Sequence, residues 1–402
     1  MATAKLKFND LEFRKTKEGL EVALLGNYNF IIPKGDIERL GQPTIGKDRH
    51  AIEFKGLEQK KAERFNFLIA NNIHKLKNKI SNRPAVYIHQ NSGIPLMGTV
   101  YFGIVDKGSD MVEVKPISCC NINCVFCSVG EGIYSRKEVD YVVEEDYLVN
   151  ELKALLEYKK HEGMKIFINP HGEPLLYRNI ISLVGRISKL KYVETVSIIT
   201  NGVLLSKALI DGLKEAGLTQ INLSINALDE DKARMLSGIK SYDINSIKRS
   251  AEYAAKRLKL VIAPVWIKGL NDEEIEKIIE FAKKLGAEAG IQKFIAHKKG
   301  KKPAEEIGWD DFYSKLGEWE KRHSMKLKGI CRPEETRELP MPFKRDDVIE
   351  AEIVAPGRNP HEMIAASRAR SIVVFGCDGK IGDAARLRLI EAKHNIFVGK
   401  EI

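Results

Sequence analysis

The sequence predicts an α/β protein in which a central parallel sheet is flanked by a smaller domain at each end. From about residue 111 to 324, short apolar runs rich in β-branched residues alternate with amphipathic helical runs, as in parallel strands joined by helices. On both sides of this region, short β-like runs are separated by Gly, Pro and Asn. We therefore expect an N-terminal α+β domain (1–110), the central domain (111–324), a linker (325–343) and a C-terminal domain (344–402).

Six strand–helix units can be counted in the central domain. Six units in about 215 residues suit an open partial (β/α)6 barrel better than a closed barrel of eight units. The expected strands are MVEVKPIS, MKIFINP, ETVSIITNG, TQINLSINA, KLVIAPVWI and AGIQKFIA.

The two flanking domains have different patterns. The N-terminal domain combines β-like runs with one long expected helix, GLEQKKAERFNFLIANNIHKLKNKI, in which apolar residues recur at spacings of three and four. These residues are Phe65, Leu68, Ile69, Ile73 and Leu76. The C-terminal domain has short strands with Gly-containing turns over about 60 residues, which predicts a small, OB-like β-barrel.

Composition narrows the class of protein. The apolar runs of the 402-residue chain are far too short to span a membrane, and its N-terminus, MATAKLKFNDLEFRK, lacks the apolar core of a secretory signal. We expect a cytoplasmic protein with no membrane partner. Six cysteines, four of them within nine positions, do not fit a disulfide framework, and a net charge of +10 weakly favours a polyanionic partner.

Three cysteines have the spacing of a metal-binding loop. Cys120, Cys124 and Cys127 form C-x3-C-x2-C directly after the first expected strand of the central domain, where barrel folds place their chemistry. Thiolates this close together can bind one iron–sulfur cluster. Three ligands for four irons leave one iron open to a small chelating cofactor.

A fourth cysteine, Cys119, precedes this triplet. Adjacent residues at a strand end point to opposite faces, so Cys119 and Cys120 are not expected to bind the same iron. Cys119 is then a buried small side chain, which we favour, or a reactive thiol or ligand of an auxiliary cluster. The alternative for the whole group is a zinc site that uses all four cysteines, although it lacks the separated pairs that zinc prefers.

The segment CNINCVFC resembles the signature loop of the radical S-adenosylmethionine (SAM) superfamily. The resemblance implies a [4Fe–4S] cluster bound by Cys120, Cys124 and Cys127, with SAM chelating the open iron and Phe126 near the adenine. One electron from an external donor would then cleave SAM to methionine and a 5′-deoxyadenosyl radical that abstracts hydrogen.

The later strand ends also resemble this family, in the expected order. HGEP at the end of the second strand is similar to the family motif GGEP, which implies that Gly172 and Glu173 engage the SAM amino group. His171 replaces the first glycine, and is either a proton carrier near the substrate or a tolerated side chain.

Polar groups follow the later strands. The resemblance implies contacts of these groups with the SAM ribose and carboxylate, although helix caps or Asx turns are an alternative for each. The residues are Thr200 and Asn201 after the third strand, Ser224 and Asn226 after the fourth, and Gln292 on the sixth.

The C-terminal segments DDVIEAEIVAPGR and ARSIVVFGCDGKIGDAARLRLIEAKHNIFVGKEI resemble TRAM domains, small β-barrels attached to several RNA-modifying enzymes. The resemblance implies an archaeal-type RNA-modifying enzyme that binds RNA through its flanking domains. Basic residues of this domain would gather on one face, or else form an ordinary solvated surface. They are Arg358, Arg368, Arg370, Arg386, Arg388 and Lys393.

These features predict a radical SAM enzyme that modifies RNA by methylation or another C–H functionalisation. The expected substrate is a tRNA nucleoside. Sulfur insertion is disfavoured because residues 1–118 contain no cysteine for a second cluster. Methylation through a methyl-cysteine would need another thiol, from Cys119, Cys377 or the linker residue Cys331, and Cys331 is our candidate. The alternatives are a radical SAM enzyme acting on a peptide or small metabolite, and a non-catalytic RNA-binding protein containing metal.

Overall fold

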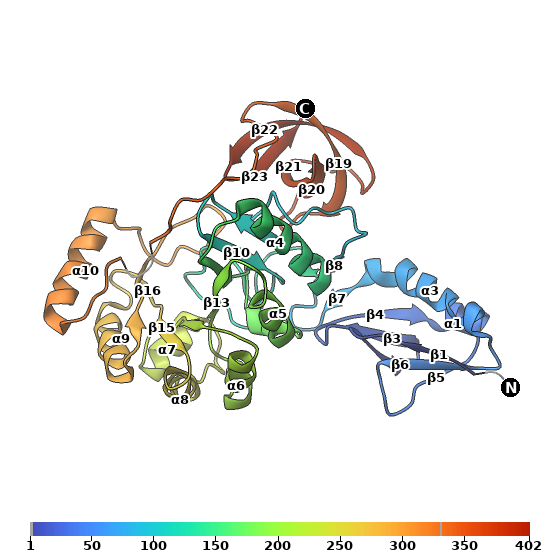
Figure 1. Ribbon diagram of the computed structural model, residues 1–402, viewed down its shortest axis with the longest axis horizontal. Helices are drawn as coiled ribbons and strands as arrows, with labels where there is room; N and C mark the ends of the chain where they lie inside the picture. Colours follow the sequence, from blue (N-terminus) through green and yellow to red (C-terminus); the bar gives the residue numbers. More distant parts are fainter. Residues whose placement is uncertain (1–2, 330–331) are drawn as a thin grey trace.

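The computed structural model describes residues 3–329 and 332–402. The chain forms three bodies (Figure 1). The N-terminal sheets lie at one end of the long axis, the helix-covered central sheet occupies the middle and the other end, and a small barrel packs on top of the central body.

The N-terminal body contains two antiparallel sheets, with strand orders β1-β6-β5 and β2-β3-β4-β7. Their inward side chains include Phe13 and Phe54, whose rings pack against Phe65 of the helix that covers them. The strands are β1 (Thr3–Lys7), β2 (Leu11–Lys15), β3 (Gly19–Leu24), β4 (Tyr28–Pro33), β5 (Pro43–Thr44), β6 (Ala51–Lys55) and β7 (Lys77–Asn78).

The long helix expected here is broken, so its predicted extent was wrong. The side-chain amide of Asn72 donates to the Leu68 carbonyl (2.8 Å), a local bond that competes with the helical ladder. Leu76 has already left the helix, with φ −55° and ψ 133°. The helical segments are α1 (Lys34–Leu40), α2 (Gln59–Ala62), α3 (Arg64–Asn72) and the 3₁₀ turn η1 (Ile73–Lys75).

The central sheet has seven strands in the order β17-β15-β14-β13-β12-β10-β9. Six are parallel and β9 pairs antiparallel with β10 at one edge. This arrangement agrees with the predicted alternation of strands and helices, while the partial (β/α)6 barrel stays a prediction. The strands are β9 (Gly103–Asp106), β10 (Met111–Lys115), β12 (Met164–Ile168), β13 (Val193–Thr200), β14 (Gln220–Leu223), β15 (Lys259–Ile262) and β17 (Glu288–Ala289).

Amphipathic helices connect these strands and bury their apolar faces. Three begin with a side-chain cap from Ser206, Asp229 or Asp243, which accepts a backbone N–H of the first turn. The helices are α4 (Glu145–Lys159), η2 (Pro174–Leu176), α5 (Ile180–Ile187), α6 (Lys207–Glu215), α7 (Glu230–Ser237), α8 (Ile244–Ala255), α9 (Asp272–Leu285) and α10 (Trp309–His323).

The fifth and sixth expected strands are each split in two. After β15, Pro264 interrupts the strand because it has no N–H to donate, and its carbonyl accepts the N–H of Gln292 (2.7 Å). The second halves, β16 (Val265–Trp266) and β18 (Gln292–Lys293), form a separate parallel pair.

The predicted boundary at residue 110 differs from the structure. The strands β8 (Ala85–Ile88) and β9 lie before this boundary, yet β8 pairs with β11 (Asp140–Val143) and β9 joins the central sheet. The domain to which these two strands belong depends on the strands with which they pair. Strand propensity in the sequence gives no information about that pairing.

The C-terminal body is a closed barrel of order β19-β20-β21-β23-β22, which confirms the predicted small β-barrel. Its core contains Phe343, Ile353, Ile372, Leu387 and Phe397. The strands are β19 (Val348–Pro356), β20 (Glu362–Ser367), β21 (Arg370–Phe375), β22 (Ala384–Lys393) and β23 (Ile396–Glu401).

Residues 334–335, which precede the barrel, contact the central body. Glu335 pairs with Ser109, and the N–H of Glu334 donates to the Asp110 carboxylate (2.9 Å). Across residues 3–329 and 332–402, none of the helices has the length and apolar character that crossing a bilayer requires.

Candidate active site

The three predicted metal ligands lie on the loop that follows β10, here called the cluster loop (residues 116–139). Two neighbouring segments hold its backbone. The N–H groups of Asn123 and Val125 donate to carbonyls at the end of α7 (2.9 and 3.0 Å), and Lys301 donates to the Cys127 carbonyl (3.0 Å). The cysteine segment is therefore fixed at the carboxyl end of the sheet.

Cys120, Cys124 and Cys127 line one cavity of about 310 Å³, here called the cluster cavity. Burial, and then the neighbouring Cys127 thiol, raise the pKa of Cys124 to about 12. Burial and then Cys124 raise the pKa of Cys120 in the same way. Buried thiols that resist ionisation need a cation to become thiolates, so this donor set fits a bound cationic centre.

Two hydrogen-bond donors point at these sulfur atoms. The backbone N–H of Glu131 donates to Cys127 Sγ (3.3 Å), and Asn201 Nδ2 lies 3.8 Å from Cys120 Sγ. Donors to ligand sulfurs stabilise thiolates and tune an iron–sulfur centre. Over the described ranges, no three His, Cys, Asp or Glu side chains are placed to hold a single metal ion.

Cys119 does not join the triplet. Its side chain is fully buried, and its Sγ lies 3.8 Å from the hydroxyl of Tyr28 on β4. Burial, and then Asp140, raise the pKa of the Cys119 thiol to about 12. This placement agrees with the favoured interpretation of Cys119 as a buried neutral side chain.

The HGEP turn packs directly on the cluster loop. A Cβ on Gly172 would lie 2.0 Å from the Cys119 carbonyl oxygen, so only glycine fits. The N–H of Glu173 donates to that same carbonyl (2.7 Å). The Glu173 carboxylate is buried and accepts bonds from Thr200 Oγ1 (2.7 Å) and from the N–H groups of Leu175 (3.0 Å) and Asn201 (2.8 Å).

Glu173 should make stability depend on pH. Burial raises the pKa of this carboxyl from 4.5 to about 7, although its three hydrogen bonds oppose the shift. Between these values the unfolded chain releases the proton and the folded chain keeps it. The free energy of unfolding should therefore fall by about 3 kcal/mol as pH rises from 4.5 to 7. Urea unfolding of iron-free wild type and Glu173→Gln across this range measures the difference, and parallel curves would contradict it.

All eight predicted SAM-binding residues line the cluster cavity together with the cysteines, as the convergence of parallel strand ends requires. They are Phe126, Gly172, Glu173, Thr200, Asn201, Ser224, Asn226 and Gln292. Four of these side chains already have internal partners, and Glu173 and Thr200 are bonded to each other. Asn226 Oδ1 accepts the N–H of Val265 (2.8 Å), and Asn201 Nδ2 donates to Asn121 Oδ1 (2.8 Å).

Of the two predicted catalytic residues, His171 lies outside this group. His171 is half-buried and packs edge-on against Tyr101, with ring centroids 6.0 Å apart, outside the cavity wall. Burial and nearby cations, Lys115 first, lower its pKa well below 6.5, so its imidazole is neutral. Cys331 lies outside the described residues. Cys377 is buried in the C-terminal barrel.

Sequence reasoning missed two residues of the cavity wall. Glu131 and Tyr242 line it and are buried. Glu131 lies only four residues after Cys127, and this proximity is the one signal that could have singled it out. Tyr242 comes from a segment without a recognisable motif.

Family comparison agrees with this geometry. A family model described as the radical SAM superfamily matches residues 114–282, which include the three cysteines and the strand ends around the cavity. The chain contains a radical SAM domain. Radical SAM enzymes use a [4Fe–4S] cluster with SAM and need an electron donor.

The chain is also similar to individual proteins. It is 35% identical over 367 residues to the Methanocaldococcus jannaschii protein MJ0103, covering 83% of this chain and 84% of that protein. It is 29% identical to the GTP 3′,8-cyclase of Thermodesulfovibrio yellowstonii, over 45% of this chain and 54% of the cyclase, so the chain spans about half of that enzyme. The crystal structure of Streptococcus suis SuiB bound to SAM is 15% identical, with a TM-score of 0.42 over 80% of this chain and 71% of SuiB.

The radical SAM cofactors supply one-electron cleavage of SAM and a radical that abstracts hydrogen from a substrate. The chain's own groups do the rest. Cys120, Cys124 and Cys127 would hold the cluster, and the backbone N–H of Glu131 and the amide of Asn201 would orient and stabilise the thiolates. The apolar wall, Phe126 included, excludes water.

Proposed function

We propose that this protein is a radical SAM enzyme that functionalises a C–H bond of RNA, and specifically of a tRNA nucleoside, by methylation or a related reaction. The observation that carries the proposal is a second cavity of about 750 Å³, here called the substrate chamber. It shares wall residues with the cluster cavity, among them Asn169, Gln292 and Lys293. A substrate bound there would lie next to the site of radical formation.

The walls of the chamber suit a planar ring with polar edges. On one side α10 contributes Trp309 and Tyr313, which stack on each other with centroids 5.8 Å apart and are about half exposed. The chamber is also lined by the amides of Gln220 and Asn222 on β14. Aromatic faces stack on bases, and amides recognise base edges.

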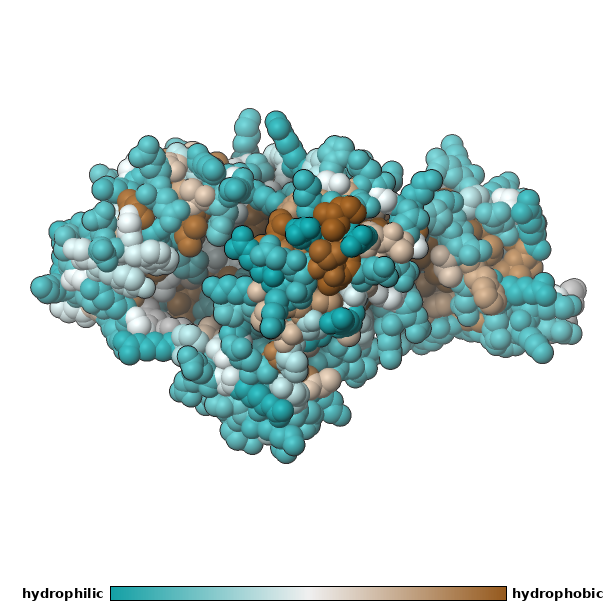
Figure 2. All heavy atoms as spheres, turned by 90° about the horizontal axis from the view of Figure 1, so that it is seen from above, coloured by the Kyte–Doolittle hydropathy of each residue, from teal (hydrophilic) through white to brown (hydrophobic). Residues whose placement is uncertain are grey.

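The outer face of the C-terminal barrel supports a polyanionic partner. Arg386 and Arg388 point outward from β22, and Lys400 of β23 is the register partner of Arg388. Figure 2 shows the side of the molecule on which the barrel lies, where hydrophobic residues gather near the centre of a hydrophilic surface. The barrel exposes Val348, Ile390 and Ile402. Cations beside exposed apolar groups suit an RNA backbone with unstacked bases.

Three of the six basic residues predicted to bind RNA make hydrogen bonds within the protein. Arg358 is 1% exposed, which corrects its assignment to an RNA-binding surface. Arg370 is half-buried and donates to Asn395 Oδ1 (3.0 Å), and Arg368 donates to the Pro342 carbonyl (3.0 Å). This internal use of cations favours the second candidate, a peptide or small-metabolite substrate. In favour of a nucleotide, the GTP 3′,8-cyclases are named for a reaction on GTP.

Mass spectrometry of nucleosides from cells with and without the gene tests the proposal. We expect one modified tRNA nucleoside to disappear without the gene. The anaerobically reconstituted protein should regenerate it and form 5′-deoxyadenosine in proportion. An unchanged nucleoside profile with continued 5′-deoxyadenosine formation would replace RNA by the second candidate. No 5′-deoxyadenosine at all would overturn the enzyme itself.

Trp309→Ala should weaken substrate binding without impairing SAM cleavage. Loss of one stacking face costs about 1–3 kcal/mol per base. Because about 1.4 kcal/mol corresponds to a tenfold change in affinity, we expect KM to rise roughly tenfold. Trp309→Phe keeps a ring and should recover most of this loss. KM for tRNA and substrate-free 5′-deoxyadenosine formation are the measurements. An unchanged KM for Trp309→Ala would remove the stacking role.

A further inference from the structure

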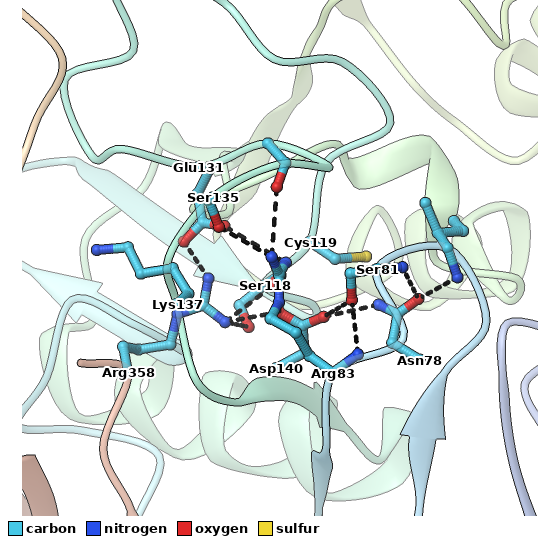
Figure 3. A network of polar contacts seen from close by, with 12 residues as sticks. Asn78, Ser81, Arg83, Ser118, Cys119, Glu131, Ser135, Lys137, Asp140 and Arg358 are labelled. Carbon is cyan, nitrogen blue, oxygen red and sulfur yellow. Dashed lines mark hydrogen bonds and ion pairs between the residues drawn. The ribbon is translucent and has the colours of Figure 1, made fainter. Parts of the chain in front are cut away.

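A buried network of charged and polar side chains lies against the cluster loop and joins four segments of the chain (Figure 3). The N-terminal region contributes Asn78, Ser81 and Arg83, the cluster loop contributes Ser118, Glu131 and Ser135, β11 contributes Asp140, and the C-terminal barrel contributes Arg358. Two guanidinium groups thus face two carboxylates away from solvent.

Arg358 reaches this network from the turn between β19 and β20. The turn is tight, since a Cβ on Gly357 would lie 2.4 Å from the Glu362 carbonyl oxygen. The Arg358 guanidinium is 1% exposed and donates to Ser118 O (3.1 Å), Ser118 Oγ (2.9 Å) and Asp140 Oδ1 (2.8 Å). It also donates to the Val139 carbonyl and to Glu131 Oε1.

These contacts grip both ends of the segment that carries the metal ligands. Ser118 lies two residues before Cys120, and Glu131 lies four residues after Cys127. The Glu131 backbone N–H itself donates to Cys127 Sγ (3.3 Å). One rigid, forked cation therefore fixes the separation of the two ends of the cysteine segment.

Attachment of the barrel to the central body does not depend on Arg358. Ser371 bonds through its N–H to the Met97 carbonyl (2.7 Å) and through its hydroxyl to the Pro95 carbonyl (2.6 Å), and the Phe397 N–H donates to the Gly98 carbonyl (2.9 Å). Burying a guanidinium carries a desolvation cost that docking by backbone bonds avoids. The placement of Arg358 is explained by what it touches, which is the cluster loop.

We propose that Arg358 is a positioning residue for the [4Fe–4S] cluster, so that the C-terminal barrel completes the cluster site in addition to any role in substrate binding. The barrel and the central domain then form one functional unit. This inference stands whether the substrate is RNA or not.

Full-length Arg358→Gln, with Arg345→Gln as the matched control, tests the proposal. Arg345 is an exposed residue just before the same barrel. After anaerobic reconstitution, we expect Arg358→Gln to lose iron to a chelator roughly 10-fold faster. The EPR signal of its reduced cluster should change, and its response to SAM should weaken. Arg358→Lys, which keeps the charge but not the fork, should lie between Arg358→Gln and wild type. Arg345→Gln should match wild type.

Two further measurements separate positioning from folding and from RNA binding. The Tm of the iron-free variants reports folding, and the salt dependence of RNA binding should be unchanged in Arg358→Gln. A folded Arg358→Gln protein with wild-type iron retention and a wild-type EPR response to SAM would overturn the proposal. If Arg358→Gln does not fold, Glu131→Gln weakens the same grip at one end. A wild-type EPR spectrum for that variant would overturn the proposal equally.

Discussion

Cys120→Ala is expected to abolish cluster binding and reduce SAM cleavage to background, whereas Cys119→Ala, one residue earlier, keeps both. Cys120 lines the cluster cavity with Cys124 and Cys127, and Asn201 Nδ2 lies 3.8 Å from its Sγ. Cys119 points into the core, where its Sγ lies 3.8 Å from the Tyr28 hydroxyl. A cluster that already has only three protein ligands cannot lose another without losing its attachment. Cys119→Ala instead removes one buried atom, at a cost of about 1 kcal/mol in stability.

Iron and sulfide content after anaerobic reconstitution, with 5′-deoxyadenosine formed under reductant, measure both variants. Cys124→Ala should behave as Cys120→Ala does. Iron retained at the wild-type level in Cys120→Ala, or lost in Cys119→Ala, would mean that the structure has placed the wrong cysteine at the cavity.

The central fold could be predicted because its signal is local. Each strand and each helix has its own periodicity, and parallel connections leave few ways to order them. The prediction failed where a long-range partner decides. The composition of β9 predicts a strand but not its sheet, and β9 belongs to the central sheet because it pairs with β10. Leu76 fits the apolar spacing of the expected helix, although it lies beyond the end of the helix. Its side chain is buried in an extended backbone, so the apolar pattern alone could not reveal where the helix ends.

The candidate site divides in the same way. Glu173, Thr200 and Asn226 could be predicted because strand ends meet at one edge of a parallel sheet, whatever the connections between them. The inward course of Arg358 could not be predicted. Arg358 lies 240 residues after Ser118 in the sequence. The residues next to Arg358 in the sequence do not indicate that its guanidinium contacts the cluster loop.

Gly172→Ala should disable the site although it adds a single methyl group to the turn. The new Cβ would lie 2.0 Å from Cys119 O and 2.6 Å from the carbon of the same carbonyl. These are backbone atoms that no side-chain rotation can move. The Glu173 N–H donates to that carbonyl (2.7 Å), so relieving the clash also breaks this bond. We expect a loss of stability of about 1–3 kcal/mol from overpacking and a cluster loop displaced at the residue next to Cys120.

Gly93→Ala is the matched control for this effect. Gly93 has a φ of +71° and nothing within 4 Å of its would-be Cβ, so it tests backbone strain without a clash. That strain should cost about 1 kcal/mol and leave iron content unchanged. In Gly172→Ala we expect the iron content and SAM cleavage to fall together, since Cys120 and the SAM-facing turn move as one unit. If SAM cleavage were lost while the iron content stayed normal, the substitution would have disturbed Glu173 alone. The HGEP turn and the cluster loop would then not move as one unit.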